Sequence, residues 1–189
     1  MRMMKLALAT GFALLIGSGS AYAITVKKRI EAPGLPPDIW AIAGAFCQIK
    51  DWHPAVAECA ETKDGDVVFR TLTLKDGAKI KEKLTGTEDL SYSYEIVESP
   101  LPVKDYSSKL WVEEDDEPDR SVIYWQSEFD PADGTSEEDA KKIITGILGD
   151  GVKGIKKNAL AAWDKAHPEE AGGGTSGGGG AAADDEDDD

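Results

Sequence analysis

The chain has 189 residues and carries 36 acidic against 21 Lys and Arg side chains, which gives a formal net charge of −15 at pH 7. A field of this sign repels phosphate backbones, so the composition argues against a nucleic-acid-binding protein. It would speed association with a basic partner, but charge alone does not separate that role from solubility. The length between the two atypical ends suits one domain with one core.

Residues 1–23 have the three parts of a secretory signal peptide. Arg2 and Lys5 supply the positive start, residues 6–16 form an apolar run, and Ala21-Tyr22-Ala23 is a small-x-small cleavage site. The run is too short for a membrane span, which needs roughly 20 residues. We therefore expect cleavage after Ala23, a periplasmic location and no transmembrane segment in the mature protein. Cleavage would remove two cations and leave a net charge of −17.

The segment after the signal predicts a strand and then a short helix. Residues 24–32 alternate as a strand does, and Pro33–Pro37 ends the alternation. The apolar residues that follow at helical spacing are Ile39, Ile42, Ala43 and Phe46.

The next feature is an elbow from Cys47 to Cys59, which holds a Trp52-His53-Pro54 turn between the only two cysteines. We expect a second short helix over Pro54–Ala60. An even number of cysteines in an exported protein favours pairing, so we predict a Cys47–Cys59 disulfide worth roughly 3 kcal/mol. A redox-active pair is the alternative, but the spacing is far from Cys-x-x-Cys.

A series of strands is predicted after the elbow. Their expected ranges are Val67–Leu74, Ala78–Leu84, Ser91–Glu98, Tyr106–Val112 and Ser121–Phe129. A three-residue loop of Lys75, Asp76 and a left-handed Gly77 would place Leu72 opposite Ile80 and Arg70 opposite Glu82. A two-residue turn would shift the pairing by one residue and mix polar with apolar faces, so we favour the longer loop.

The folded part ends with a long helix that begins after Ser136, a good N-cap. Four glycines within it, Gly146, Gly149, Gly151 and Gly154, each cost roughly 1 kcal/mol relative to alanine. They indicate a close approach to a sheet or ligand, or a break near Gly149; packing against the sheet is favoured. Residues 169–189 are rich in glycine and end in six acidic residues, so we expect a disordered tail.

This order of elements predicts an α+β fold, in which a curved antiparallel sheet wraps around the last helix and two short helices follow the first strand. Such a sheet often leaves an apolar cavity beneath the helix.

Several motifs resemble the SRPBCC group of the START-like superfamily, which has the helix-grip fold, and within it the polyketide cyclase/dehydrase branch. The matching segments include Trp52–Val56, Arg70–Leu74 with Asp76-Gly77, and Tyr92–Val97. The resemblance covers nearly all of a domain at 24–168. A signal peptide with cysteines flanking Trp-His-Pro is further similar to the MxaD family, periplasmic accessory proteins of bacterial methanol oxidation. That resemblance implies methanol dehydrogenase or a c-type cytochrome as partners.

The polar and aromatic candidates of the predicted cavity each have a structural alternative. Arg70 and Glu82 could orient a ligand or neutralise each other on the concave face. His53 titrates near neutral pH, but His167 is the only other histidine and no free thiolate remains. We therefore predict no catalytic residue, no metal site and no cofactor. The candidate cavity-lining residues are Trp52, His53, Arg70, Glu82, Tyr94, Trp111 and Trp125.

Three functions follow from these predictions. The first is a non-enzymatic periplasmic accessory protein that assists methanol dehydrogenase and its cytochrome c electron acceptor. The second is a carrier of a small apolar or aromatic ligand in the cavity. The third, an enzyme of the cyclase or dehydrase type, ranks lowest because no base and nucleophile are brought together in the sequence.

Overall fold

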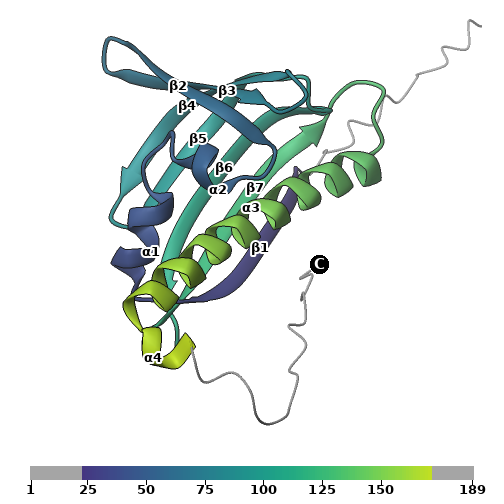
Figure 1. Cartoon of the computed structure of the whole chain (residues 1–189). Coiled ribbons are helices and arrows are strands. Elements are labelled where there is room, and N and C mark those ends of the chain that lie inside the picture. Colours follow the sequence, from purple (N-terminus) through teal and green to yellow (C-terminus); the bar gives the residue numbers. More distant parts are fainter. Residues whose placement is uncertain (1–22, 172–189) are drawn as a thin grey trace, which may run out of the picture.

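The computed structural model describes residues 23–171, which form one curved antiparallel sheet with helices on its concave side (Figure 1). The strands are β1 (Ile24–Pro33), β2 (Val56–Asp64), β3 (Val67–Leu74), β4 (Lys79–Glu88), β5 (Ser91–Glu98), β6 (Val103–Glu114) and β7 (Arg120–Pro131). The helices are α1 (Pro36–Ala43), α2 (Ile49–Trp52), α3 (Glu137–Ala166) and α4 (Pro168–Ala171).

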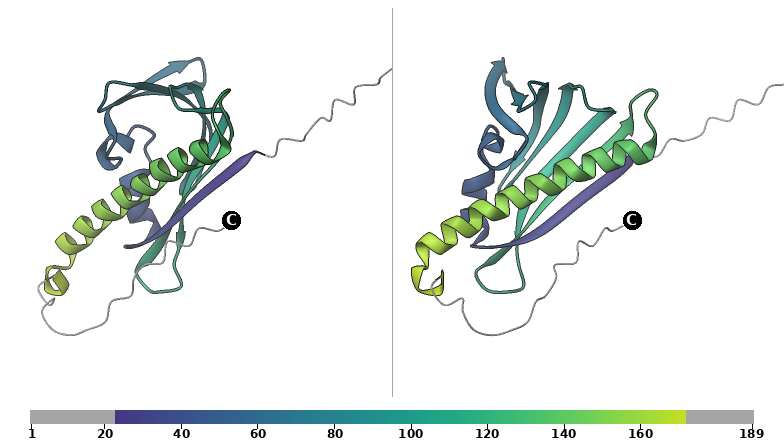
Figure 2. Two further views of the ribbon diagram at one scale, coloured as in Figure 1. Left: turned by 90° about the vertical axis from the view of Figure 1, so that its right-hand side faces the viewer. Right: turned by 45° about the vertical axis from the view of Figure 1, so that its right-hand side comes forward.

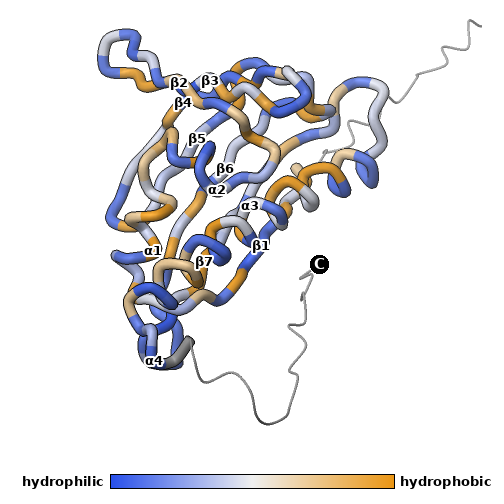
Figure 3. The backbone as a smooth tube through the Cα atoms, viewed as in Figure 1, coloured by the Kyte–Doolittle hydropathy of each residue, from blue (hydrophilic) through white to orange (hydrophobic). Residues whose placement is uncertain are grey.

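The strands lie in the order β1-β7-β6-β5-β4-β3-β2, and every neighbouring pair is antiparallel. Figure 2 shows the sheet bending around α3, while α1 and α2 lie beside that helix over the other half of the sheet. The predicted α+β helix-grip fold with two short helices after the first strand is confirmed. Hydrophobic and hydrophilic residues alternate along the strands and recur on successive turns of α3 (Figure 3).

The hairpin of β3 and β4 has the predicted register. Arg70 pairs with Glu82 and Leu72 with Ile80. The backbone N–H of Leu74 donates to the carbonyl of Ala78 at 2.8 Å, and Gly77 has φ +88°. The three-residue loop therefore keeps the charged pair and the apolar residues on one face.

The second short helix was expected over Pro54–Ala60, and that position is wrong. The helix is α2, which ends before His53 because the backbone there turns to φ −86° and ψ 119°. Residues from Val56 onward form β2, an edge strand whose side chains are mostly exposed. An exposed edge strand lacks the apolar alternation by which a strand is predicted.

Helix α3 runs unbroken from Glu137, so the alternative of a break near Gly149 is wrong. The Ser136 hydroxyl accepts from the N–H of Asp139 at 3.1 Å, which confirms the predicted N-cap. A Cβ atom at Gly154 would overlap the backbone carbonyl of Trp52, and one at Gly151 would overlap the Trp125 ring. Two of the four glycines thus permit close approach. Gly146 and Gly149 face open space.

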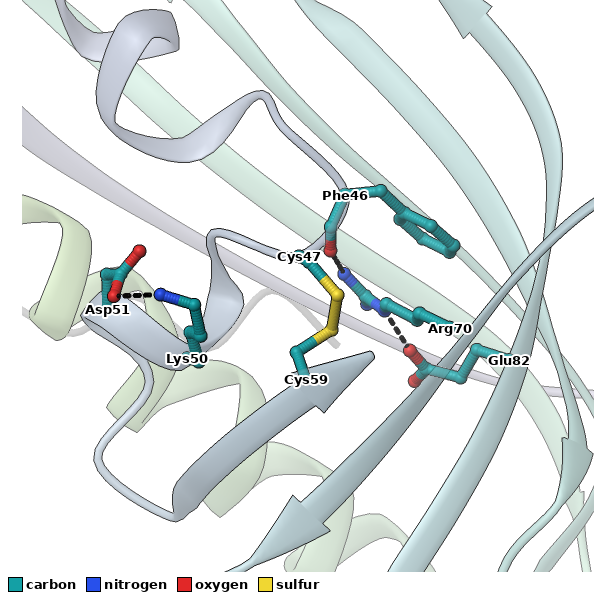
Figure 4. Close-up of a disulfide and its surroundings, with 7 residues drawn as sticks. All are labelled: Phe46, Cys47, Lys50, Asp51, Cys59, Arg70 and Glu82. Atoms are coloured by element: carbon teal, nitrogen blue, oxygen red, sulfur yellow. Dashed lines mark hydrogen bonds and ion pairs between the residues drawn. A yellow bond between two sulfur atoms is a disulfide. The ribbon is translucent and has the colours of Figure 1, made fainter. Parts of the chain in front are cut away.

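The predicted disulfide joins Cys47, just before α2, to Cys59 of β2, with a Cα–Cα distance of 5.5 Å. It ties the short helices to the edge of the sheet beside Arg70 and Glu82 (Figure 4). Helix α4 extends the folded part three residues into the expected tail. The signal peptide with its cleavage site and the acidic end of the chain lie almost wholly outside the described residues.

Candidate functional site

Six of the seven predicted cavity residues lie together between the sheet and the helices. They are Trp52, His53, Arg70, Glu82, Tyr94 and Trp125, each at most 6% exposed. Trp111 is the exception, and its prediction as a lining residue is wrong. It follows Leu110, which is fully buried, so strand alternation turns Trp111 to the outer face. There it stacks on Tyr124 with ring centroids 4.9 Å apart.

The Arg70–Glu82 ion pair is the centre of this interior. The Arg70 Nε donates to Glu82, and its Nη1 donates to the Phe46 carbonyl after α1 (Figure 4). The guanidinium also lies over the rings of Phe46 and Tyr94, 4.0 and 4.9 Å from their centroids. Burial acts to lower the pKa of Arg70, but the charge and hydrogen bond of Glu82 together with the hydroxyls of Tyr92 and Tyr94 outweigh it, and the pKa is raised. Arg70 is therefore a permanent cation held by protein groups.

A hydroxyl network lies beside the pair, and the sequence prediction does not include most of it. Trp125 Nε1 donates to Ser108 Oγ at 2.9 Å and contacts the Tyr94 hydroxyl at 3.2 Å. Ser127 Oγ joins Ser108 Oγ at 2.9 Å and the Tyr106 hydroxyl at 2.6 Å. Burial raises the pKa of Tyr94 well above its ordinary value, so its hydroxyl stays neutral. The sequence signal for this network is the alternation of side chains along β5, β6 and β7, which places these polar residues on one face of the sheet.

Both ring nitrogens of His53 are engaged by backbone groups. The N–H of Ala55 donates to Nδ1 at 3.2 Å, so Nε2 carries the proton and donates to the carbonyl of Ile147 in α3 at 3.1 Å. Desolvation by burial lowers the pKa of His53, which keeps the ring neutral. The histidine therefore orients the elbow against α3, as the structural interpretation of the Trp-His-Pro turn predicts. Asn158 adds a second link, from Nδ2 to the carbonyl of Asp51 at 3.1 Å.

Three buried polar atoms of this interior have no hydrogen-bond partner within the described part of the chain. They are Trp52 Nε1, Arg70 Nη2 and the Tyr92 hydroxyl. A buried group of this kind costs about 1–3 kcal/mol unless something satisfies it. Trp52 lines the groove of about 580 Å³ described below, whereas neither Arg70 nor Tyr92 lines any of the four hollows described there.

The hollows lined by residues between 23 and 171 include four partly open ones, with volumes of about 630, 580, 430 and 270 Å³. The one of about 580 Å³ is a groove between the elbow and α3, lined by Trp52 and His53. Between residues 23 and 171, no cluster of three or more His, Cys, Asp or Glu side chains could hold a metal ion. In the same range no helix combines the length and the apolar character that crossing a bilayer demands.

Comparison with known proteins identifies similar sequences and structures. A family profile described as "Polyketide cyclase / dehydrase and lipid transport" matches residues 23–160. The protein XoxI from Bacillus cereus is 32% identical, with a TM-score of 0.67 over 72% of this chain and 95% of that chain. None of the curated proteins compared with the chain matches it.

Two more distant structures share the fold alone. The Zhui aromatase/cyclase from a Streptomyces species is 11% identical, with a TM-score of 0.60 over 80% of this chain and 99% of that chain. A START superfamily protein from Mycobacterium smegmatis is 13% identical, with a TM-score of 0.60 over 73% of this chain and 98% of that chain.

Proposed function

Since the chain belongs to the polyketide cyclase/dehydrase and lipid transport family, we propose a function within this helix-grip group that needs no chemistry of its own. The protein is a periplasmic accessory factor that engages methanol dehydrogenase, its cytochrome c electron acceptor, or both. The sequence features that support export and the resemblance to the MxaD family motivate this proposal.

The main observation behind the proposal is that the titratable groups of the interior already have hydrogen-bond partners within the protein. Arg70 is bound by Glu82 and by a backbone carbonyl, and both nitrogens of His53 are hydrogen-bonded to backbone groups. A general base or nucleophile needs a free lone pair or proton within reach of a substrate. Arg70 and His53 are therefore better suited to a structural role than to catalysis. The acidic surface is the feature that a basic partner would contact.

The acidic tip of the β6–β7 hairpin is the first surface to test. Asp115 and Glu117 pair with Arg120, at 3.7 and 3.4 Å, whereas Glu114 and Asp116 are exposed and form no ion pair with any described residue. The exposed pair is thus available to a partner.

The test is a pull-down with the tagged chain from Ile24 as bait in periplasmic extract of methanol-grown cells. We expect the dehydrogenase or a c-type cytochrome at low ionic strength and its loss at about 1 M salt, where the Debye length is about 3 Å. Glu114→Gln with Asp116→Asn should reduce the recovery. The matched change Glu137→Gln with Glu138→Gln, at the start of α3, should not. Recovery of neither protein under any condition would refute the proposal.

A second candidate function is carriage of a small ligand, and the unpartnered atoms of the interior favour it. Arg70 Nη2 and the Tyr92 hydroxyl are buried without partners, and the family description includes lipid transport. Mass spectrometry of organic extracts of the purified protein tests this. A stoichiometric species that is depleted in Tyr92→Phe would support the carrier, and extracts without any reproducible species would exclude it.

A further inference from the structure

The groove between the elbow and α3 differs in charge from the rest of this acidic chain. Its lining includes four lysines and two aspartates, a formal net charge of +2, whereas the whole chain carries −15. The lysines are Lys50, Lys75, Lys153 and Lys157, and the aspartates are Asp51 and Asp150. The other three hollows have no excess of cations in their linings. The groove is therefore suited to an anionic ligand.

Three of these four lysines are free to bind an anionic ligand. Lys50 forms an ion pair with Asp51 at 2.7 Å. Lys75, Lys153 and Lys157 are exposed and form no ion pair with any residue between 23 and 171. Three unpaired cations around one groove repel each other until an acidic group enters.

We propose that this groove is a binding site for an acidic peptide segment, and that the chain's own end, Asp184–Asp189, occupies it. The six residues of that segment are all Asp or Glu. They offer several carboxylates to cations arranged on α3 and on the β3–β4 loop, so the charges are complementary.

The length of the connecting chain fits the distance. The linker begins after Ala171, at the end of the short helix α4 that follows α3. Helix α3 ends at Ala166, and Lys153 lies 13 residues earlier, which corresponds to about 20 Å along the helix. Residues 172–183 consist of Gly, Ala, Ser and Thr, and a glycine-rich segment of that length has a root-mean-square span of about 20 Å. A linker whose span matches the separation of its ends gives the highest effective concentration, in the millimolar range. A linker of this length can bring the acidic end to the groove.

If the tail occupies the groove, it blocks the access of other acidic ligands. Any acidic partner would have to displace the tail before it could reach Lys153 and Lys157. This inference does not depend on methanol dehydrogenase, so the two proposals can fail separately.

Nitrogen-15 amide spectra of two full-length mature chains test the proposal. One chain is native, and in the other Asp184–Asp189 are replaced by Asn and Gln, so the length is unchanged. We expect amide shift differences at Lys75, Lys153, Lys157 and their neighbours at low ionic strength, and their loss at about 1 M salt. Identical spectra, or differences confined to residues next to Ala171, would overturn the proposal.

A pair of charge-reversal variants supplies the control. Lys153→Glu with Lys157→Glu should abolish the tail-dependent differences. Lys142→Glu with Lys165→Glu, two exposed lysines of the same helix outside the groove, should preserve them. Equal loss in both variants would show non-specific attraction and contradict a site. If the amide shift differences grow with protein concentration, the tail binds the groove of a second copy, and the proposal of binding within one chain is overturned.

Discussion

The Arg70–Glu82 pair sets the character of the interior at the scale of single residues. Both side chains are almost fully removed from solvent, at 0% and 6% exposure. Burial of two charges is costly, and the pair is tolerated because each charge meets the other and Arg70 also binds a carbonyl. The net contribution of the pair to stability is therefore small compared with the cost of leaving one charge alone.

Loss of one member should be worse than loss of both. We expect Glu82→Leu or Arg70→Met to lower the free energy of unfolding by about 3–5 kcal/mol, since each leaves an unpaired buried charge. The double variant should cost clearly less than the sum of the single changes. Urea denaturation of the four proteins measures these energies. Single losses below about 1 kcal/mol would contradict the buried pair.

His53 should make the fold sensitive to acid. Its pKa in the folded protein is lowered from 6.5, so the unfolded chain binds the proton more tightly. The contribution of the neutral ring is fully present above about pH 6.5 and declines as the pH falls below that value. We expect the stability advantage of the wild type over His53→Gln to shrink between about pH 7.5 and about pH 5. An advantage that is constant over this window would refute the assignment of the neutral ring.

At the scale of elements, α3 is held to the elbow by close backbone approach. The carbonyl of Trp52 occupies the space where residue 154 would place a Cβ atom, and Trp125 occupies the space at residue 151. A glycine at these two positions is a packing requirement, although glycine is a poor helix former.

Two alanine substitutions on one helix should therefore have opposite effects. We expect Gly154→Ala to lower the free energy of unfolding by about 1–3 kcal/mol, because α3 must move away from the elbow. Gly149→Ala, which meets open space, should raise it by up to about 1 kcal/mol. Thermal and urea unfolding measure both. A gain in stability from Gly154→Ala would show that the contact is not close.

At the scale of the whole molecule, the disulfide joins the two short helices to the sheet. Cys47–Cys59 links the segment between α1 and α2 to the edge strand β2, and no cysteine is free. The layer of short helices is therefore covalently fixed to the edge farthest from β1.

Removal of the bridge should weaken the fold as a whole. We expect Cys47→Ala with Cys59→Ala to lower the free energy of unfolding by about 3 kcal/mol. Reduction of the wild type should have the same effect, which provides the control. Thiol titration of the unfolded, unreduced protein should find no reactive thiol, and two thiols would refute the bridge.

The sequence suffices for most of the fold but not for the arrangement of the site. The register of β3 and β4 is predictable because Leu72, Ile80, Arg70 and Glu82 must share a face. Strand β2 is not, because an exposed edge strand has little apolar pattern. Nor does the sequence tell which face of a strand is buried when both carry aromatic residues, and so Trp111 is misplaced. The contact of Arg70 with the Phe46 carbonyl depends on tertiary packing that no local pattern encodes.

The position of β1 has a consequence for how the molecule is made. The first strand of the domain pairs along its length with β7, the last strand, and it also packs against α3. An emerging polypeptide cannot complete this sheet until β7, at residues 120–131, is available, so this pairing of high sequence separation must form late. We expect nascent chains that stop before residue 120 to remain protease-sensitive, because β1 then has no strand to pair with.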